Sequence, residues 1–167
     1  DKNLKEVFFQ DLEINEPDYY LDSAKETPIP TIGNILIKID KILDDLSPDA
    51  FLVLGDTNSC MCTIAAKKKK IPIFHLEAGN RCFDMRVPEE TNRIIVDHIS
   101  DINLTYSDIA RSYLIKEGLN PDQIIKVGSP MYEVIAKHKN KILKSNILDH
   151  FLLNLKSIFW FPVIEKK

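Results

Sequence analysis

Short apolar runs that alternate with helical patterns constrain the fold of this chain more than any other feature of its sequence. The apolar runs at residues 51–54, 71–76, 101–105 and 123–127 are predicted strands. Each is followed by a stretch with the three- and four-residue apolar spacing of a helix. Strands that alternate with helices form right-handed crossovers and a parallel sheet with helices on both faces. The sequence therefore predicts an α/β fold.

The helix predicted over residues 31–46 has the clearest pattern. Its apolar residues recur at three and four, Thr31 is the expected N-cap, and Ser47-Pro48 ends it. Further helices are predicted over residues 3–12, 60–69, 91–100 and 107–117, and from residue 131 onward.

Two of these elements carry expectations about burial. Residues 51–54 are apolar and partly β-branched, so this strand is predicted to be buried on both faces. In the helix over 91–100, the apolar side chains of Ile94, Ile95 and Ile99 are expected to face inward.

Composition places the chain among ordinary globular proteins. Its 167 residues suffice for one domain, and a hydrophobic fraction of 44% argues against disorder. With a net charge of −3, attraction to nucleic acid or to an anionic membrane is not expected, and no apolar run has the length of a membrane span. Cys60, Cys62 and Cys82 lack the spacing of a disulfide framework or a zinc site. These features predict a protein of the reducing cytoplasm.

Four carboxylates follow predicted strands or begin the helix beside them: Asp56, Glu77, Glu89 and Glu90. Ligands of open parallel sheets bind outside the carboxyl ends of the strands, where these side chains are expected to converge. The arginines interspersed among them are Arg81, Arg86 and Arg93. Carboxylates clustered with cations are typical of acid–base sites. Each carboxylate taken alone also has a structural interpretation, as a helix cap or as part of an acidic first turn.

Two histidines are given structural roles rather than catalytic ones. His75 lies within a predicted strand and is expected to be a near-core side chain with its hydrogen bonds satisfied. His98 falls in the middle of a predicted helix and is expected to be structural or at the surface.

Four motifs resemble, in their order and spacing, those of the non-hydrolysing UDP-N-acetylglucosamine 2-epimerase family: GDTNS at 55–59, HLEAGNR at 75–81, VPEETNR at 87–93 and VGSPMYE at 127–133. The sequence RCFDMRVPEETNR is most similar to a branch that acts on modified UDP-sugars, including enzymes that form UDP-N-acetyl-L-fucosamine. The resemblance implies two Rossmann-like domains facing a cleft, an architecture shared with many nucleotide-sugar glycosyltransferases.

The resemblance also implies an isomerase of surface or capsular polysaccharide synthesis that inverts C2 of a UDP-N-acetylhexosamine. A base removes the C2 proton while UDP leaves C1, and UDP returns after a proton reaches the opposite face. The resemblance further implies a UDP-sugar ligand and a homodimer, with no cofactor and no metal. Motif positions imply catalytic carboxylates at Asp56, Glu77 and Glu89, and substrate-binding residues at Glu90, Arg93, Arg81 and Ser129. The alternatives are a glycosyltransferase of the same architecture and a non-catalytic remnant.

The family pattern is longer than this chain at both ends, since an opening strand with a Thr-Arg-Pro-Glu element and a second domain with a Ser-x-His-Arg-Glu element are not found. Residues 1–145 are therefore predicted to be part of the first domain. Residues 146–167 are predicted to be a truncated tail, whose bulky apolar residues a change of reading frame near Lys156 would explain. For the chain alone we expect an exposed apolar sheet edge, low stability and no epimerase activity.

Overall fold

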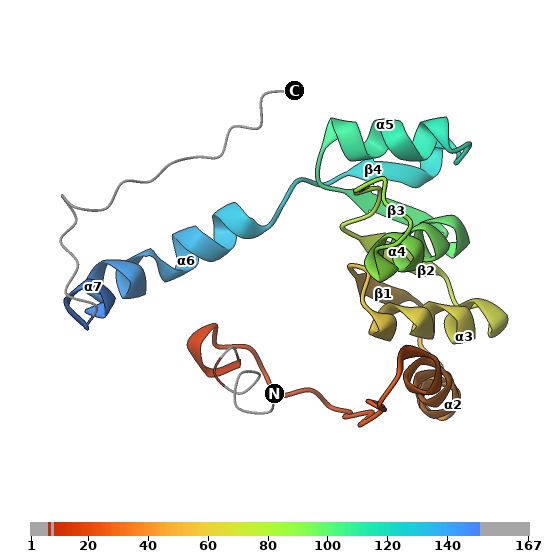
Figure 1. Cartoon of the computed structure of the whole chain (residues 1–167), viewed down its shortest axis with the longest axis horizontal. Coiled ribbons are helices and arrows are strands. Elements are labelled where there is room, and N and C mark those ends of the chain that lie inside the picture. Colours follow the sequence, from red (N-terminus) through yellow and green to blue (C-terminus); the bar gives the residue numbers. More distant parts are fainter. Residues whose placement is uncertain (1–6, 8, 151–167) are drawn as a thin grey trace. The chain divides into compact units, whose positions relative to one another are not determined.

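The computed structural model describes residue 7 and residues 9–150 of the chain (Figure 1). It divides into two compact units, Asn15–Ser129 and a second unit of Asp1–Ile14 with Pro130–Lys167. None of the helices that the structure describes is long and apolar enough to cross a membrane.

In the unit Asn15–Ser129, strands and helices alternate as predicted (Figure 1). In chain order its elements are α2 (Pro28–Leu46), β1 (Phe51–Leu54), the 3-10 helix η1 (Asn58–Cys62), α3 (Thr63–Lys68), β2 (Ile73–Leu76), α4 (Pro88–Ile99), β3 (Ile102–Thr105), α5 (Asp108–Lys116), the 3-10 helix η2 (Pro121–Gln123) and β4 (Ile124–Lys126).

The four strands form one parallel sheet in the order β1-β2-β3-β4. The register aligns Val53 with His75, His75 with Asn103, and Asn103 with Ile124 across the sheet. All four carboxyl ends therefore lie at one edge of the sheet. The predicted parallel α/β class is confirmed.

The two faces of the sheet differ in burial. Val53, Ile73 and Ile124 point to the face that α3, α4 and α5 contact, and all three are buried. Leu52 and Leu54 point to the opposite face, where their side chains are 65% and 59% exposed. The prediction that this strand is buried on both faces is therefore wrong. The reason is that α3, α4 and α5, the described helices that contact the strands, lie on the face of Val53 and not on both faces as the sequence predicted.

Helix α2 begins three residues earlier than predicted. Its N-cap is Thr27, and Pro28 occupies the first helical position, where a missing N–H costs no hydrogen bond. Thr31, the predicted cap, lies inside the helix and donates its hydroxyl to the Thr27 carbonyl at 2.9 Å. The predicted end is confirmed, because Ser47 adopts a left-handed φ of 43°.

Helix α4 turns an unexpected face toward the protein. Ile95 is 37% exposed, so the prediction that it faces inward is wrong. The buried residues of this helix are Glu90, Asn92, Arg93, Val96 and Asp97. Four of these five are polar or charged, which indicates that the buried face of α4 takes part in a polar network rather than in an apolar core.

The second unit contains α6 (Met131–Lys144) and α7 (Ile147–His150). Lys141 of α6 pairs with Glu13 at 2.6 Å and donates to the Asp11 carbonyl at 3.2 Å. Of the predicted helix over 3–12, residues 7 and 9–11 are helical, whereas residues 3–6 and 8, like the tail from residue 151 onward, lie outside the described residues.

Candidate active site

Arg93 of α4 joins the loops that follow β1 and β2. Its Nη2 pairs with the carboxylate of Asp56 and lies 3.0 Å from Oε1 of Glu77. Its Nη1 donates to the Glu77 backbone carbonyl. The Arg93 side chain is 7% exposed, so this cation offsets the repulsion between the two carboxylates in a poorly solvated place. The structure thus brings together two of the predicted catalytic residues.

A hollow of about 270 Å³ lies beside these residues at the carboxyl edge of the sheet. Its lining is Asp56, Asn80, Arg81, Cys82, Val87, Glu89, Glu90 and Arg93. Within the part of the chain that the structure describes, the exposed carboxylate of Glu89 forms no hydrogen bond or ion pair. Its carboxylate is therefore available to a molecule in the hollow.

Glu90 has the opposite environment. It is 5% exposed, and its carboxylate accepts hydrogen bonds from the backbone N–H groups of Cys82 at 3.0 Å and Phe83 at 2.9 Å. Burial alone would raise the pKa of Glu90, but these donors together outweigh burial and hold it below its usual range. Glu90 therefore shapes the wall of the hollow by fixing the loop that precedes α4.

The turn after β2 holds Glu77 in a sparsely populated backbone conformation. Its φ is 70°, in the left-handed region that side chains other than glycine rarely adopt. Gly79 follows with φ 77°, and a Cβ placed there would lie 2.5 Å from the Ala110 carbonyl oxygen. Strained backbone of this kind is concentrated at functional sites and persists only when its surroundings hold it.

Arg81 directs its guanidinium to carboxylates of the protein itself. Nη1 lies 2.7 Å from Asp97, and Nη2 lies 2.7 Å from Glu117. Burial opposes the charge of Arg81, but the two carboxylates raise its pKa above the usual range. The substrate-binding role of Arg81 stays a prediction.

His75 is fully buried within the sheet. Its Nδ1 lies 2.8 Å from Oδ1 of Asp97, and its Nε2 lies 2.9 Å from the Gly55 carbonyl oxygen. The prediction of a satisfied near-core histidine is confirmed. His98 is half-exposed and lies 3.1 Å from Glu117, away from the lining of the hollow.

Sequence reasoning missed two side chains of this region. Asn92 donates to the Asp56 carbonyl at 2.9 Å and so fixes the loop after β1. Asp97 is fully buried and contacts three groups of the site's framework. Its position one helical turn after Arg93 was the available signal, because residues four apart share a helix face.

A family model described as UDP-N-acetylglucosamine 2-epimerase matches residues 1–160. This chain belongs to that family. It is 54% identical to UDP-N-acetylglucosamine 2-epimerase from Rickettsia bellii, with a TM-score of 0.86 over 91% of this chain and 41% of that one. The resemblance inferred from the four motifs is confirmed.

Two further epimerases support the assignment. The Methanocaldococcus jannaschii structure in complex with UDP-GlcNAc and UDP is 34% identical, with a TM-score of 0.82 over 87% of this chain and 41% of that one. The UDP-2,3-diacetamido-2,3-dideoxy-D-glucuronate 2-epimerase of Pseudomonas aeruginosa is 40% identical over 136 residues, which are 80% of this chain and 38% of its own length. The chain thus spans about two fifths of the length of these relatives.

The last predicted site residue of this epimerase-family chain, Ser129, follows β4 at the same edge of the sheet but does not line the hollow. Tyr106 follows β3, and its pKa is raised by burial first and by the negative charge of Glu77 second. Tyr106 therefore belongs to the surroundings of Glu77, although no motif singled it out.

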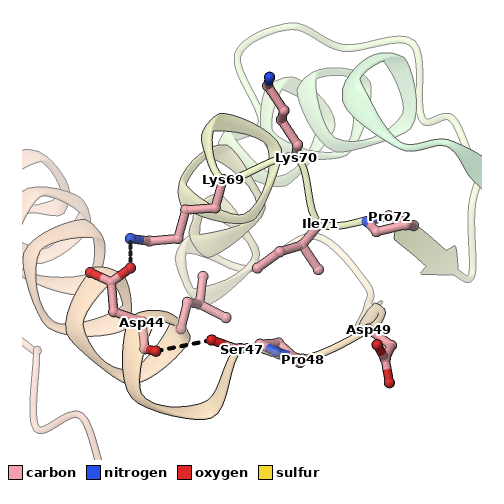
Figure 2. Close-up of a pocket in the computed structure, with 9 residues that line it drawn as sticks. Asp44, Ser47, Pro48, Asp49, Lys69, Lys70, Ile71 and Pro72 are labelled. Atoms are coloured by element: carbon pink, nitrogen blue, oxygen red, sulfur yellow. Dashed lines mark hydrogen bonds and ion pairs between the residues drawn. The ribbon is translucent and has the colours of Figure 1, made fainter.

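A larger hollow of about 500 Å³ lies where the end of α2 meets the residues before β2 (Figure 2). There Lys69 pairs with Asp44 and, at 2.9 Å, with Asp40. Ser47 donates to the Asp44 carbonyl at 3.2 Å. This hollow lies at the amino-terminal edge of the sheet, opposite the edge that carries Asp56, Glu77 and Glu89. Lys69, Asp44 and Ser47 are thus engaged with one another or with Asp40, so we interpret the hollow as a seam between α2 and α3.

Proposed function

We propose that this chain carries the first-domain part of the active site of a UDP-N-acetylhexosamine 2-epimerase. The observation that carries the proposal is the attachment of Asp56 and Glu77 to one buried arginine, Arg93. Beside them Glu89 lines a hollow at the carboxyl edge of a parallel sheet, where ligands of such sheets bind.

The proposed reaction exchanges a proton at C2 by elimination and addition. A carboxylate takes the C2 proton, the electrons of that C–H bond form a C1=C2 double bond, and the C1–O bond breaks so that UDP leaves with its electron pair. Protonation of C2 on the opposite face and return of UDP to C1 complete the inversion. Proton transfer on two faces needs carboxylates at two positions, which Asp56, Glu77 and Glu89 supply.

Arg93 has a supporting role in this proposal. It compensates the charges of Asp56 and Glu77 and holds both oxygens at one place, so a sugar ring bound above them meets carboxylates in a fixed geometry. Glu90 contributes indirectly, because its hydrogen bonds to the loop at 82–83 fix the wall of the hollow.

The proposed ligand is a UDP-sugar, and the proposed working form is a cytoplasmic homodimer without a cofactor. Support for the ligand comes from relatives that were solved with UDP-GlcNAc bound. The sugar itself stays open between N-acetylglucosamine and modified sugars. A relative named as a UDP-N-acetylglucosamine 2-epimerase homolog and one named for a diacetamido-glucuronate each match this chain at 40% identity.

A chimera tests this function, because the chain alone is expected to be inactive. Residues 1–145 of this chain would replace the matched segment of the Rickettsia bellii protein. In D₂O the folded chimera should incorporate deuterium at C2 of UDP-N-acetylglucosamine, detected by NMR. Sugar transfer to an acceptor without C2 exchange would instead indicate a glycosyltransferase. A folded chimera with neither activity, beside an active Rickettsia bellii control, would contradict the proposal.

A further inference from the structure

We propose that Asp97 is a positioning residue that fixes the two carboxylate-bearing turns of the site, at residues 55–57 and 77–79, relative to each other. The inference rests on the proposed function, since it concerns how Asp56 and Glu77 are presented. Asp97 lies outside the four family motifs and does not line the hollow. It acts in this proposal through the backbone and through His75.

The first connection is to the turn that carries Glu77. Oδ1 and Oδ2 of Asp97 lie 3.2 and 3.3 Å from the backbone nitrogen of Gly79, which donates to the carboxylate. Glu77 is two residues away at a φ of 70°, and a turn in that conformation relaxes unless its neighbours hold it. Asp97 supplies that restraint from within the protein, where it is fully buried.

The second connection is to the turn that carries Asp56. Oδ1 of Asp97 lies 2.8 Å from Nδ1 of His75, and Nε2 of the same ring lies 2.9 Å from the carbonyl oxygen of Gly55. Gly55 immediately precedes Asp56 and has a φ of 81°. One buried carboxylate thus reaches both turns, one directly and one through an imidazole ring.

The position of Asp97 on α4 explains why this link is rigid. Arg93, one turn earlier on the same helix, binds the side chains of Asp56 and Glu77 and the Glu77 carbonyl. Asp97 instead reaches the backbone of the neighbouring glycines, Gly79 directly and Gly55 through His75. Arg81 adds a further contact to Asp97 at 2.7 Å, so the buried charge is paired as well as hydrogen bonded. A single helix, α4, therefore restrains both the side chains of Asp56 and Glu77 and the backbone turns that carry them.

Carbon-13 NMR of the side-chain carboxyl groups in the 167-residue chain tests the proposal. Asp97→Asn should shift the resonances of both Glu77 and Asp56. The matched control is Asp101→Asn, since Asp101 also accepts from a backbone N–H, that of Ile73 at 2.9 Å, and pairs with Lys67 at 2.6 Å, but at the other edge of the sheet. The shifts in Asp97→Asn should be several-fold larger than in the control. Equal shifts, or none, would overturn the proposal.

A second variant and a measurement on the unaltered chain cover the case in which Asp97→Asn does not fold. His75→Gln breaks only the second connection, so it should shift Asp56 and leave Glu77 in place; a shift of neither would overturn the proposal. In the unaltered chain the Gly79 amide should exchange with D₂O as slowly as the amides of β2, and fast exchange would exclude the first connection. The NMR and amide-exchange measurements use no ligand. They can therefore contradict the role of Asp97 while the epimerase assay of the chimera succeeds, and they can support it while that assay fails.

Discussion

At the residue scale, Glu89 and Glu90 are neighbours with different tasks. Glu90 is buried and bound by two backbone N–H groups, and Glu89 is exposed beside the hollow. Their adjacent places in the motif suggested that both belong to the site. Their burial shows the difference: the Glu89 carboxylate is available to a ligand, whereas the Glu90 carboxylate holds a loop. Asp97 had no such motif, and its importance arises from contacts with residues distant in sequence.

The loop-holding task of Glu90 predicts a pH-dependent effect of Glu90→Gln. The substitution should lower the free energy of unfolding by about 1–3 kcal/mol at neutral pH, because two hydrogen bonds to a charged acceptor are weakened. The lowered pKa of Glu90 means that its contribution is present above the ordinary carboxyl pKa of 4.5 and disappears as the pH falls through the folded-state value.

Denaturant unfolding of both proteins across this range measures the difference. The difference in free energy of unfolding between the unaltered chain and Glu90→Gln should be constant above about pH 6. It should shrink in acid, because both side chains are then uncharged. A gap that widens as the pH falls would contradict this role of Glu90.

At the element scale, the sequence predicted where the strands lie more accurately than which face of α4 is buried. The apolar runs match β1 to β4 within one or two residues at each end, since a strand inside a parallel sheet has to be apolar. For α4 the apolar spacing indicated Ile95, whereas the structure buries Arg93 and Asp97. Hydrophobic periodicity assumes an apolar core, and this helix packs against the polar framework of a site.

The turn between β2 and α4 gives a prediction at this scale. Gly79→Ala should lower the free energy of unfolding by at least about 2 kcal/mol, because the new Cβ would lie 2.5 Å from the Ala110 carbonyl oxygen and φ is 77°. The matched control is Gly33→Ala in α2, where a Cβ meets nothing within 4 Å and should stabilise the helix by about 0.5–1 kcal/mol. Thermal unfolding of the two variants compares them, and equal effects would contradict the described turn.

At the scale of the whole molecule, one face of the sheet is apolar and accessible. The register aligns Leu54 with Leu76, Leu76 with Leu104, and Leu104 with Ile125, all on the face opposite the buried Val53. Leu54 and Ile125 are exposed. The exposed apolar surface thus lies on a face of the sheet, whereas the sequence predicted it at the sheet edge. Sequence alone could not locate it, because an apolar strand residue looks the same whether or not another element covers it.

This face predicts that the chain self-associates through apolar contact. Combining Leu52→Lys with Leu54→Lys should reduce the sedimentation-average mass toward 19.2 kDa and leave the helical signal in circular dichroism unchanged. Val53→Lys, on the buried face, should instead unfold the chain. A purely monomeric unaltered chain at high concentration would contradict the prediction.

The central claim is that Asp56, Glu77 and Glu89 transfer protons at C2 of a sugar, and Glu77 is the residue that tests it most directly. In the active chimera, Glu77→Gln should slow deuterium incorporation at C2 of UDP-N-acetylglucosamine by at least about 100-fold, the range typical of a lost general acid or base. Glu26→Gln, at an exposed position before α2, should exchange at the unaltered rate. Exchange by a folded Glu77→Gln chimera at the rate of its parent would remove this glutamate from the reaction and contradict the proposed site.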